Sequence, residues 1–473
     1  MGTDVGIEVE PESCGYVSRR LILNAVLRGQ LGGHTAAWRV SSADIRDVTT
    51  LSYWVGLART LERAKFDSLF FADTLALPED PDMSLQWPLD PLVLITALGV
   101  STENIGVVAT HSTTFNSPYT TARQLSAIDH LTGGRAGWNV VTSTLGSAAE
   151  NYGNEPLPEH DLRYRVAHDY LDATKKLWHG WDVDAVVADR SSGELYDTSK
   201  IRTVDHRGEF FSVRGPLTTT RSPQTVPVIA QAGGSAPGID LAARHADIVY
   251  TRQVDIAESQ RYSTAIKSGA VGYGRRAEDV KILPGFVPVV ADSQKEAQSY
   301  VEHLRDLNDV SRRVPDLGAA LRIDLNKRDI DREFPFAELE PTTPLARSVA
   351  QYRDGAEQRT LRDVLHQVYG GMSESSGHRV VAGTVTQIVD DIQHWFDAGA
   401  LDGLSVHPHV LPDNLDAFVE RIVPELQDRG LAQTEYQQGT LREKLGLPVP
   451  SVDPSAFGAR WRGEATTPAP VGN

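Results

Sequence analysis

The feature that most constrains the fold is a regular alternation of short apolar segments with stretches of helical periodicity. Eight segments have the length and composition of strands: residues 20–27, 68–72, 105–109, 135–141, 226–230, 248–250, 282–290 and 402–407. Between the first two, Trp54, Leu57, Leu61 and Ala64 fall on one face at helical spacing. Strands that alternate with helices form parallel sheets, and eight such units favour closure. The pattern therefore predicts an α/β fold, a TIM (β/α)8 barrel.

Helical patterns fill most of the intervals between these strands. They cover residues 91–100, 118–131, 161–178, 238–245 and, as a final amphipathic helix, 415–426. Three intervals, about 142–160, 179–225 and 307–382, are longer than ordinary βα connections. Insertions of that length are usually functional lids or disordered segments. The predicted organisation is a leader at 1–19, a barrel with its insertions at 20–427 and a C-terminal arm at 428–473.

Composition limits the partners of the chain more than its chemistry. The formal charge of −17 argues against nucleic acid or an anionic membrane as the main partner. Cys14 is the only cysteine, so neither an intramolecular disulfide nor a thiolate metal cage can form. The sequence contains no apolar run of about 18 or more residues and no signal pattern at its N-terminus. These features predict a cytoplasmic protein.

Polar side chains follow several of the predicted strands, and in a barrel of this kind the chemistry lies at the C-terminal strand ends. The positions singled out are Asp73, Thr110, His111, Trp138, Asn139, residues 231–235, His407 and His409. Each has a structural alternative: Asp73 could be a helix cap, and Thr110 an ordinary β-branched strand residue. His407 and His409 resemble a metal-binding pair, but catalytic zinc needs three protein ligands, and the sequence offers no convincing third.

Two further motifs could contact a ligand. The glycine-rich turn at 232–238 leads into a predicted helix, so its backbone could approach a phosphate at the helix start, although a plain turn is the alternative. His160 and Tyr164 are four residues apart at the start of another predicted helix. They would share one helix face, either as a site or as a surface pair. Dinucleotide, Walker and nucleophile-elbow motifs do not occur.

Longer stretches of the sequence resemble one enzyme family. They are AAWR (36–39), LARTLERAKFDSLFFAD (57–73), DHLTGGRAGWNVVTS (129–143), EHDLRYRVAHDYLDATKKLW (159–178), VDHRGEFFSVRGPL (204–217), RSPQTVPVIAQAGGS (221–235) and part of the tail, 426–447. Together they resemble the nitrilotriacetate monooxygenase / dibenzothiophene-sulfone monooxygenase family. Its members are two-component FMN-dependent monooxygenases of the bacterial-luciferase superfamily. The resemblance covers roughly residues 20–450 and is weakest in 307–375.

The resemblance implies an FMN site carried by five positions. Asp73 and Thr110 match family residues after the second and third strands. His160 and Tyr164 match a His-x-x-x-Tyr pair, and Ser235 matches the serine of the glycine-rich turn. Family analogy places the first three near the isoalloxazine or ribityl chain, and Tyr164 and Ser235 nearer the phosphate. It also makes His160 the catalytic candidate, which would polarise or protonate the flavin peroxide.

The implied reaction needs partners outside the chain. Reduced FMN (FMNH2) reacts with O2 to give a C4a-(hydro)peroxide, which oxygenates a small organic substrate; an aryl sulfone, or C–S or C–N cleavage, fits the resemblance. Because the sequence lacks a nicotinamide fingerprint, a separate NAD(P)H:flavin reductase is expected. A homo-oligomer, dimer or tetramer, is also expected. His111 departs from the family's small or apolar residue and is either a substrate-specific group or a polar rim residue.

Three other functions stay open at this point. A deazaflavin-dependent dehydrogenase of the same fold would transfer hydride without oxygen. A non-catalytic flavin-binding protein would retain FMN without coupled oxygenation. A metal-dependent barrel hydrolase would use His407 and His409, which are its only support in the sequence.

Overall fold

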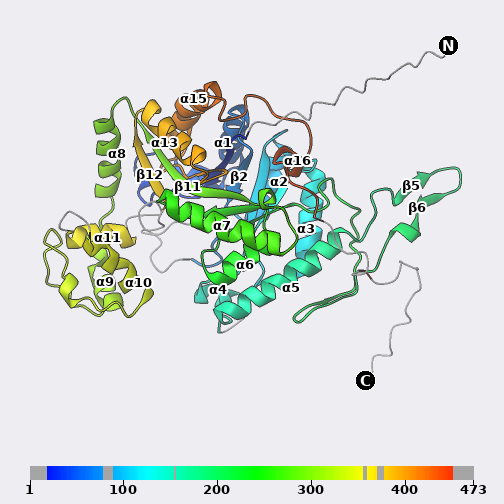
Figure 1. The fold of residues 1–473 in the computed structure, drawn as a ribbon, viewed down its shortest axis with the longest axis horizontal. Coiled ribbons are helices and arrows are strands. Elements are labelled where there is room, and N and C mark those ends of the chain that lie inside the picture. Colours follow the sequence, from blue (N-terminus) through cyan, green and yellow to red (C-terminus); the bar gives the residue numbers. More distant parts are fainter. Residues whose placement is uncertain are drawn as a thin grey trace, which may run out of the picture.

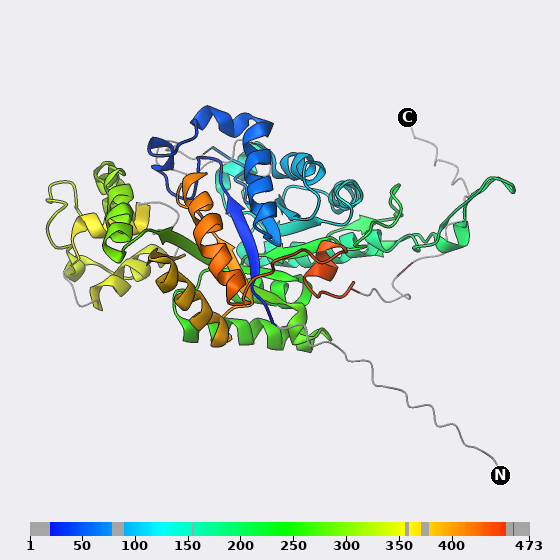
Figure 2. The ribbon, with the colours of Figure 1, turned by 90° about the horizontal axis from the view of Figure 1, so that it is seen from above.

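The computed structural model of the chain describes residues 19–77, 89–153, 156–354, 359–369, 378–450 and 457. The predicted leader, apart from Arg19, therefore lies outside the described residues, as does most of the predicted arm beyond residue 450. In the described part, helices surround a central sheet (Figure 1), and the view from above shows the same arrangement (Figure 2).

The central sheet closes on itself through parallel pairing in the order β1-β2-β3-β4-β9-β10-β11-β13, with β13 returning to β1. The strands are β1 (Ile22–Leu27), β2 (Ser68–Phe71), β3 (Gly106–Ser112), β4 (Ala136–Val141), β9 (Val228–Gln231), β10 (Ile248–Thr251), β11 (Lys281–Val290) and β13 (Gly403–Val406). They coincide with the eight predicted segments, so the TIM barrel is confirmed. β3 runs to Ser112, past its predicted end at Ala109, because it pairs with β4 as far as Val141.

A further strand, β12 (Arg379–Gly383), extends the sheet beside the barrel. β11 is ten residues long, and its second half, from Phe286 to Val290, pairs in parallel with β12. The sequence pattern placed this segment at the end of the third insertion, so β12 was not predicted. Most of its residues are only partly buried. Its apolar run, Val380 to Ala382, is three residues long, shorter than the four to eight residues that mark a buried strand in sequence.

Helices form the outer layer of the barrel (Figures 1 and 2). They are α1 (Leu51–Arg63), α2 (Pro91–Val100), α3 (Pro118–Leu131), α5 (His160–Trp178), α6 (Ala236–His245), α7 (Ile256–Gly272) and α13 (Val385–Asp397). A further helix, α8 (Gln294–Asp306), packs against β12 at the left of Figure 1. The apolar face predicted for α1 is buried, as Trp54, Leu57 and Leu61 show. Within the described ranges, no helix has both the length and the apolar character needed to cross a membrane.

The last barrel helix is broken where the sequence predicted one continuous helix. α14 (Asp413–Ala417) and α15 (Val423–Asp428) flank a π-helical turn, Phe418–Ile422. Pro424 has no amide hydrogen, so it cannot donate the regular helical bond to the carbonyl four residues earlier. Wider turns of this kind accommodate such an interruption. The predicted inward face is nevertheless buried, for example at Phe418 and Leu426.

The three long intervals contain their own secondary structure. The first contains α4 (Gly146–Asn151), and the second the hairpins β5 (Val186–Asp189)–β6 (Glu194–Tyr196) and β7 (His206–Arg207)–β8 (Ser212–Val213). The third contains α9 (Val314–Leu321), α10 (Pro344–Ala350) and α11 (Leu361–Tyr369). The β5–β6 hairpin projects from the body in Figure 1. The helices of the third interval surround a separate apolar core that includes Leu317 and Leu365.

The described part of the predicted arm packs against the N-terminal end of the barrel. Leu441 in α16 (Leu441–Lys444) and Leu447 just after it join the core formed by strand-start residues such as Ile22 and Ile248. Gly106, at the start of β3, makes room for this contact, because a Cβ there would lie 2.6 Å from Leu441 Cδ1. An apolar plug therefore covers the end of the barrel opposite to the C-terminal strand ends.

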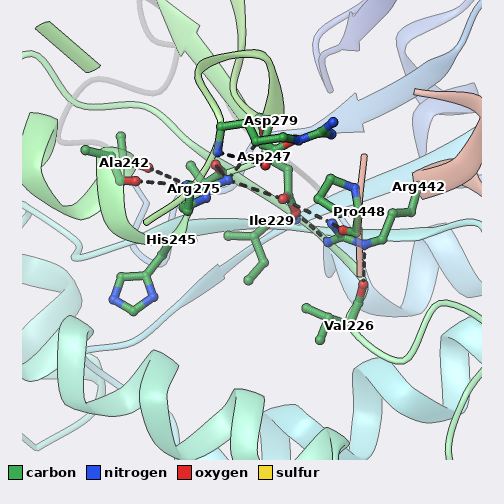
Figure 3. Close-up of polar contacts among 12 residues, drawn as sticks. Val226, Ile229, Ala242, His245, Asp247, Arg275, Asp279, Arg442 and Pro448 are labelled. Carbon is green, nitrogen blue, oxygen red and sulfur yellow. Dashed lines mark hydrogen bonds and ion pairs between the residues drawn. The ribbon is translucent and has the colours of Figure 1, made fainter. Parts of the chain in front are cut away.

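A buried ion pair ties this plug to the barrel (Figure 3). Arg442 donates from Nη2 to Asp247 Oδ2 at 2.6 Å and from Nη1 to Oδ1 at 3.1 Å. The same carboxylate accepts the amide of Ile229 at 2.9 Å, while Arg442 Nε donates to the Val226 carbonyl at 3.0 Å. Arg275 Nη2 lies 3.6 Å from Asp247. The pair thus provides hydrogen-bond partners for backbone groups at the start of β9, and it links them to Asp247, which directly precedes β10.

We expect Arg442→Met to reduce the free energy of unfolding by about 3 kcal/mol, because it leaves a buried carboxylate with fewer cationic neighbours. Urea unfolding followed by circular dichroism measures this loss. Arg421→Met is the matched control, since Arg421 pairs with the exposed Asp292 on the surface. Its cost should stay within about 1 kcal/mol. Equal losses in the two variants would contradict the role assigned to the buried pair.

Candidate functional site

A cavity of about 570 Å³ opens at the C-terminal ends of the barrel strands. This volume falls within the range of about 300–1,000 Å³ that is usual for small-molecule sites. The lining residues are Val26, Arg28, Phe70, Ala72, Asn139, Ala232, Gly233, Gly234, Tyr250, Thr251, Arg252, Gln253, Tyr262, His378, Ser405 and His407. Most of them lie at or just beyond a strand end, where the barrel rule places chemistry.

The glycine-rich turn after β9 forms one wall of the cavity. Ser235 is the N-cap of α6, and its hydroxyl accepts the amide of Gly238 at 3.3 Å. A Cβ on Gly233 would lie 2.5 Å from Gln231 Nε2, so only glycine fits there without displacing its neighbours. A Cβ on Gly234 would meet no atom within 4 Å in the described part of the chain. The turn therefore offers open backbone and a helix N-terminus to an anion.

The predicted His160 and Tyr164 pair lies beside this turn. α5 begins at His160, and the two rings are in contact, with centroids 5.0 Å apart. Tyr164 is buried, and its Oη is 3.3 Å from the position a Cβ on Gly233 would take. The His160 side chain is 49% exposed, and its Nδ1 lies 2.7 Å from Asp161 Oδ1. The pair thus places a phenol against the turn and an imidazole at the rim.

Thr110 acts on the cavity through a neighbour. It is buried on β3 and accepts a hydrogen bond from Asn139 Nδ2 at 2.9 Å. Asn139 lines the cavity, and its Oδ1 is buried with no hydrogen-bond partner among the described residues. A buried acceptor of this kind is costly unless a ligand or water donates to it. The pair therefore fits a ligand with an N–H or O–H group.

Asp73 and His111 lie at the ends of β2 and β3. Burial raises the pKa of Asp73 to about 6, against the opposing effect of the Thr74 amide, which donates to it at 2.8 Å. His111 Nε2 lies 3.0 Å from Thr121 Oγ1 on α3, and burial lowers the pKa of His111. His111 therefore contacts the helix layer, whereas its neighbour Thr110 bonds the cavity residue Asn139.

The five predicted site residues surround one part of the cavity without lining it themselves. Asp73 follows the lining residue Ala72, and Ser235 follows Gly234. Thr110 and Tyr164 reach the wall through Asn139 and Gly233, and His160 lies one helical turn further out. The structure thus places all five along the half of the barrel mouth formed by β2, β3, β4 and β9. They come from β2, β3, α5 and the start of α6.

Sequence reasoning missed much of the opposite wall. Arg28 follows β1 and Arg252 follows β10, so the strand-end rule, applied to every strand, would have found both. His378 precedes β12, the strand that was not predicted, and no sequence signal pointed to it. Arg28 and Arg252 bring positive charge to a cavity whose predicted residues carried none.

The predicted histidine pair after β13 is divided between two environments. His407 lines the cavity, whereas His409 packs edge-on against His34, with ring centroids 5.7 Å apart. Among the described residues, no group of three or more His, Cys, Asp or Glu side chains is arranged to hold a metal ion. The geometric basis of the hydrolase alternative is therefore lost.

Comparisons with known proteins agree with this geometry. A luciferase-like monooxygenase family model matches residues 31–402. The N-acetyl-S-(2-succino)cysteine monooxygenase of Bacillus subtilis is 37% identical, over 91% of this chain and 98% of its own length. Nitrilotriacetate monooxygenase component A of Aminobacter aminovorans is 38% identical, over 89% of this chain and 95% of its own length. The crystal structure of DmoA from Hyphomicrobium sulfonivorans superimposes with a TM-score of 0.78 at 32% identity. The superposition covers 90% of this chain and 92% of DmoA.

The raised pKa of Asp73 predicts a pH-dependent stability difference. The folded chain binds this proton more tightly than the unfolded chain, so the resulting stabilisation is complete below about pH 4 and is lost as pH rises through about 6. The asparagine side chain of the Asp73→Asn variant carries no charge at any pH in this range. The stability of this variant relative to the parent chain should therefore rise between pH 4 and pH 8, by about 2 kcal/mol. Denaturant titrations across this range test it; a difference that does not change with pH would contradict it.

Proposed function

The chain belongs to the luciferase-like monooxygenase family of FMN-dependent enzymes, and from that premise we propose that it oxygenates a small organic substrate with externally reduced FMN and O2. The observation that carries the proposal is the cavity at the C-terminal strand ends, walled on one side by the glycine-rich turn. The relatives' names, N-acetyl-S-(2-succino)cysteine and nitrilotriacetate monooxygenase, concern different substrates. Family membership alone therefore leaves the substrate undecided.

The residues around the glycine-rich turn and at the ends of β2 and β3 fit FMN. The α6 N-terminus with Ser235 suits a phosphate, and the Tyr164 hydroxyl lies beside the same turn. The buried Asn139 Oδ1, held by Thr110, suits an N–H group on the edge of a flavin ring. Asp73, with its raised pKa, can donate or accept a hydrogen bond near neutral pH. These residues would hold FMN and fix its orientation toward the rest of the cavity.

The bound cofactor would supply two electrons and two protons, so that one atom of O2 enters the substrate and the other leaves as water. The chain itself must position both reactants and limit access of water. His160 can exchange protons with solvent because its side chain is half exposed. Its contact with Tyr164 keeps it beside the proposed cofactor site. We assign it the transfer of a proton to the reacting oxygen.

The chain is expected to depend on a separate flavin reductase, since the sequence has no nicotinamide fingerprint. With NADH, FMN, O2 and either nitrilotriacetate or N-acetyl-S-(2-succino)cysteine, the chain alone should leave the substrate unchanged. Addition of an FMN reductase from any source should allow one atom of ¹⁸O2 to enter an accepted substrate, as measured by mass spectrometry. Sustained NADH oxidation by the chain alone would contradict this dependence.

His160→Asn should lower the coupled oxygenation rate by at least about 100-fold, the usual contribution of a positioned proton donor. The melting temperature should change little, because the side chain is half exposed. More hydrogen peroxide should be released for each reduced FMN consumed, which a peroxidase assay measures. His394→Asn on the outer helix α13 is the matched control. Unchanged coupling in His160→Asn would remove His160 from the reaction.

A further inference from the structure

Four nitrogen-bearing side chains gather on the wall of the cavity that the five predicted site residues do not reach. They are Arg28 after β1, Arg252 after β10, His378 before β12 and His407 after β13, and we call them the Arg–His cluster. β10, β13 and β1 belong to the run of neighbouring barrel strands β10-β11-β13-β1, and β12 pairs with β11, so the cluster lies along this side of the barrel.

A contact inside the Arg–His cluster fixes the tautomer of His407. Arg28 Nη2 lies 3.0 Å from His407 Nδ1, and a guanidinium can only donate. The His407 proton is therefore on Nε2, which lies 3.3 Å from Ser405 Oγ. His378 stacks on His407 with ring centroids 4.0 Å apart. Gly285 on β11 makes room for it, because a Cβ there would lie 1.9 Å from His378 Nδ1.

The cluster brings two positive charges to the cavity, one of them on a buried side chain. Arg28 is 3% exposed, and burial, followed by the charge of Arg252, lowers its pKa to about 9, so it remains a cation at neutral pH. Burial and the same two arginines lower the pKa of His378 to about 3, and His407 is likewise shifted well below its usual value. The described lining residues of the cavity include no carboxylate. Two guanidinium charges and two neutral imidazoles therefore face the ligand space.

A deeper part of the same cavity is lined by apolar and aromatic side chains. Phe70 and Tyr250 are in contact, with ring centroids 4.8 Å apart, and Val26 lies with them in the lining. A ligand that fills both parts must carry an apolar or aliphatic portion and an anionic end. Arg matches carboxylate and sulfonate oxygens with two parallel donors, and a charge-assisted hydrogen bond of this kind is about twice as strong as a neutral one.

We propose that the substrate of this enzyme is a small organic anion whose carboxylate or sulfonate group binds Arg28 and Arg252. This inference rests on the proposed function, since it names the substrate class of the same cavity. A second oxyanion, the phosphate of FMN, has the same chemistry. The glycine-rich turn and the α6 N-terminus already provide a phosphate site on the other wall. The Arg–His cluster is therefore left for the substrate.

The test uses matched acid and ester pairs on the full chain reconstituted with FMN. The probes are N-acetyl-S-(2-succino)cysteine and nitrilotriacetate, each beside its trimethyl ester, with affinities measured by isothermal titration calorimetry. At least one acid should bind about 10- to 100-fold more tightly than its ester, the range expected for hydrogen bonds to a charged group. If no acid binds more tightly than its ester, the proposal is overturned.

Substitutions assign the preference to the cluster. Arg28→Met and Arg252→Met should each reduce the acid preference, and the double variant should abolish it. Arg252 is exposed, so its variant keeps the test valid even if Arg28→Met unfolds, which melting curves report. Arg123→Met, at an exposed position on α3, is the matched control and should keep the full preference. An acid preference that survives the loss of both arginines would contradict the proposal.

A second arm separates the two oxyanion sources and the two proposals. The affinities of FMN and riboflavin are compared by fluorescence quenching in the parent chain and the arginine variants. The preference for FMN over riboflavin should not change; its loss in Arg28→Met or Arg252→Met would assign the cluster to the cofactor phosphate and overturn the substrate proposal. Acid selectivity is also measured without flavin, so a chain that fails to bind FMN would refute the proposed function alone.

Discussion

The Arg442–Asp247 ion pair holds together parts of the chain that are 195 residues apart in sequence. It lies at the N-terminal end of the barrel, where strand-start residues would otherwise leave backbone groups without partners. Asp247 accepts the Ile229 amide and Arg442 donates to the Val226 carbonyl, so the pair fixes β9 and β10 relative to each other. Both strands then deliver ligand-facing segments at their opposite ends, namely the glycine-rich turn and Arg252. The geometry of the cavity depends on this remote anchor.

Parallel strands impose the second constraint, because neighbouring side chains on one strand point to opposite sides. On β3, Thr110 bonds to the cavity residue Asn139, whereas His111 bonds to Thr121 in the helix layer. The two walls of the cavity differ for the same structural reason. One is built from a turn and a helix start, which present backbone, and the other from side chains just beyond strand ends, such as Arg28. A single mouth thus presents open backbone on one side and arginine side chains on the other.

The barrel could be predicted because each strand is a short apolar run between helical patterns, and both periods are visible in one sequence. β12 could not be predicted, since its apolar run is only three residues long and its partner is the second half of β11. The same limit applies to the site. Asp73 and Thr110 follow predicted strands, but His378 reaches His407 only because β12 aligns beside β11 and Gly285 leaves space. Such a contact depends on register, which spacing along the chain does not encode.

The net charge of the chain, taken alone, would predict that it disfavours an anionic substrate, contrary to the substrate proposed above. The chain carries a formal charge of −17, which by itself disfavours the approach of an anion. Surface charges are screened beyond about 8 Å at physiological ionic strength, whereas charges inside a cavity are screened much less. A buried guanidinium such as Arg28 therefore acts on a ligand at contact distance, where the distant surface carboxylates have little influence. Selectivity for an anion then arises after entry, from the desolvated arginine, and the acidic surface only slows the encounter.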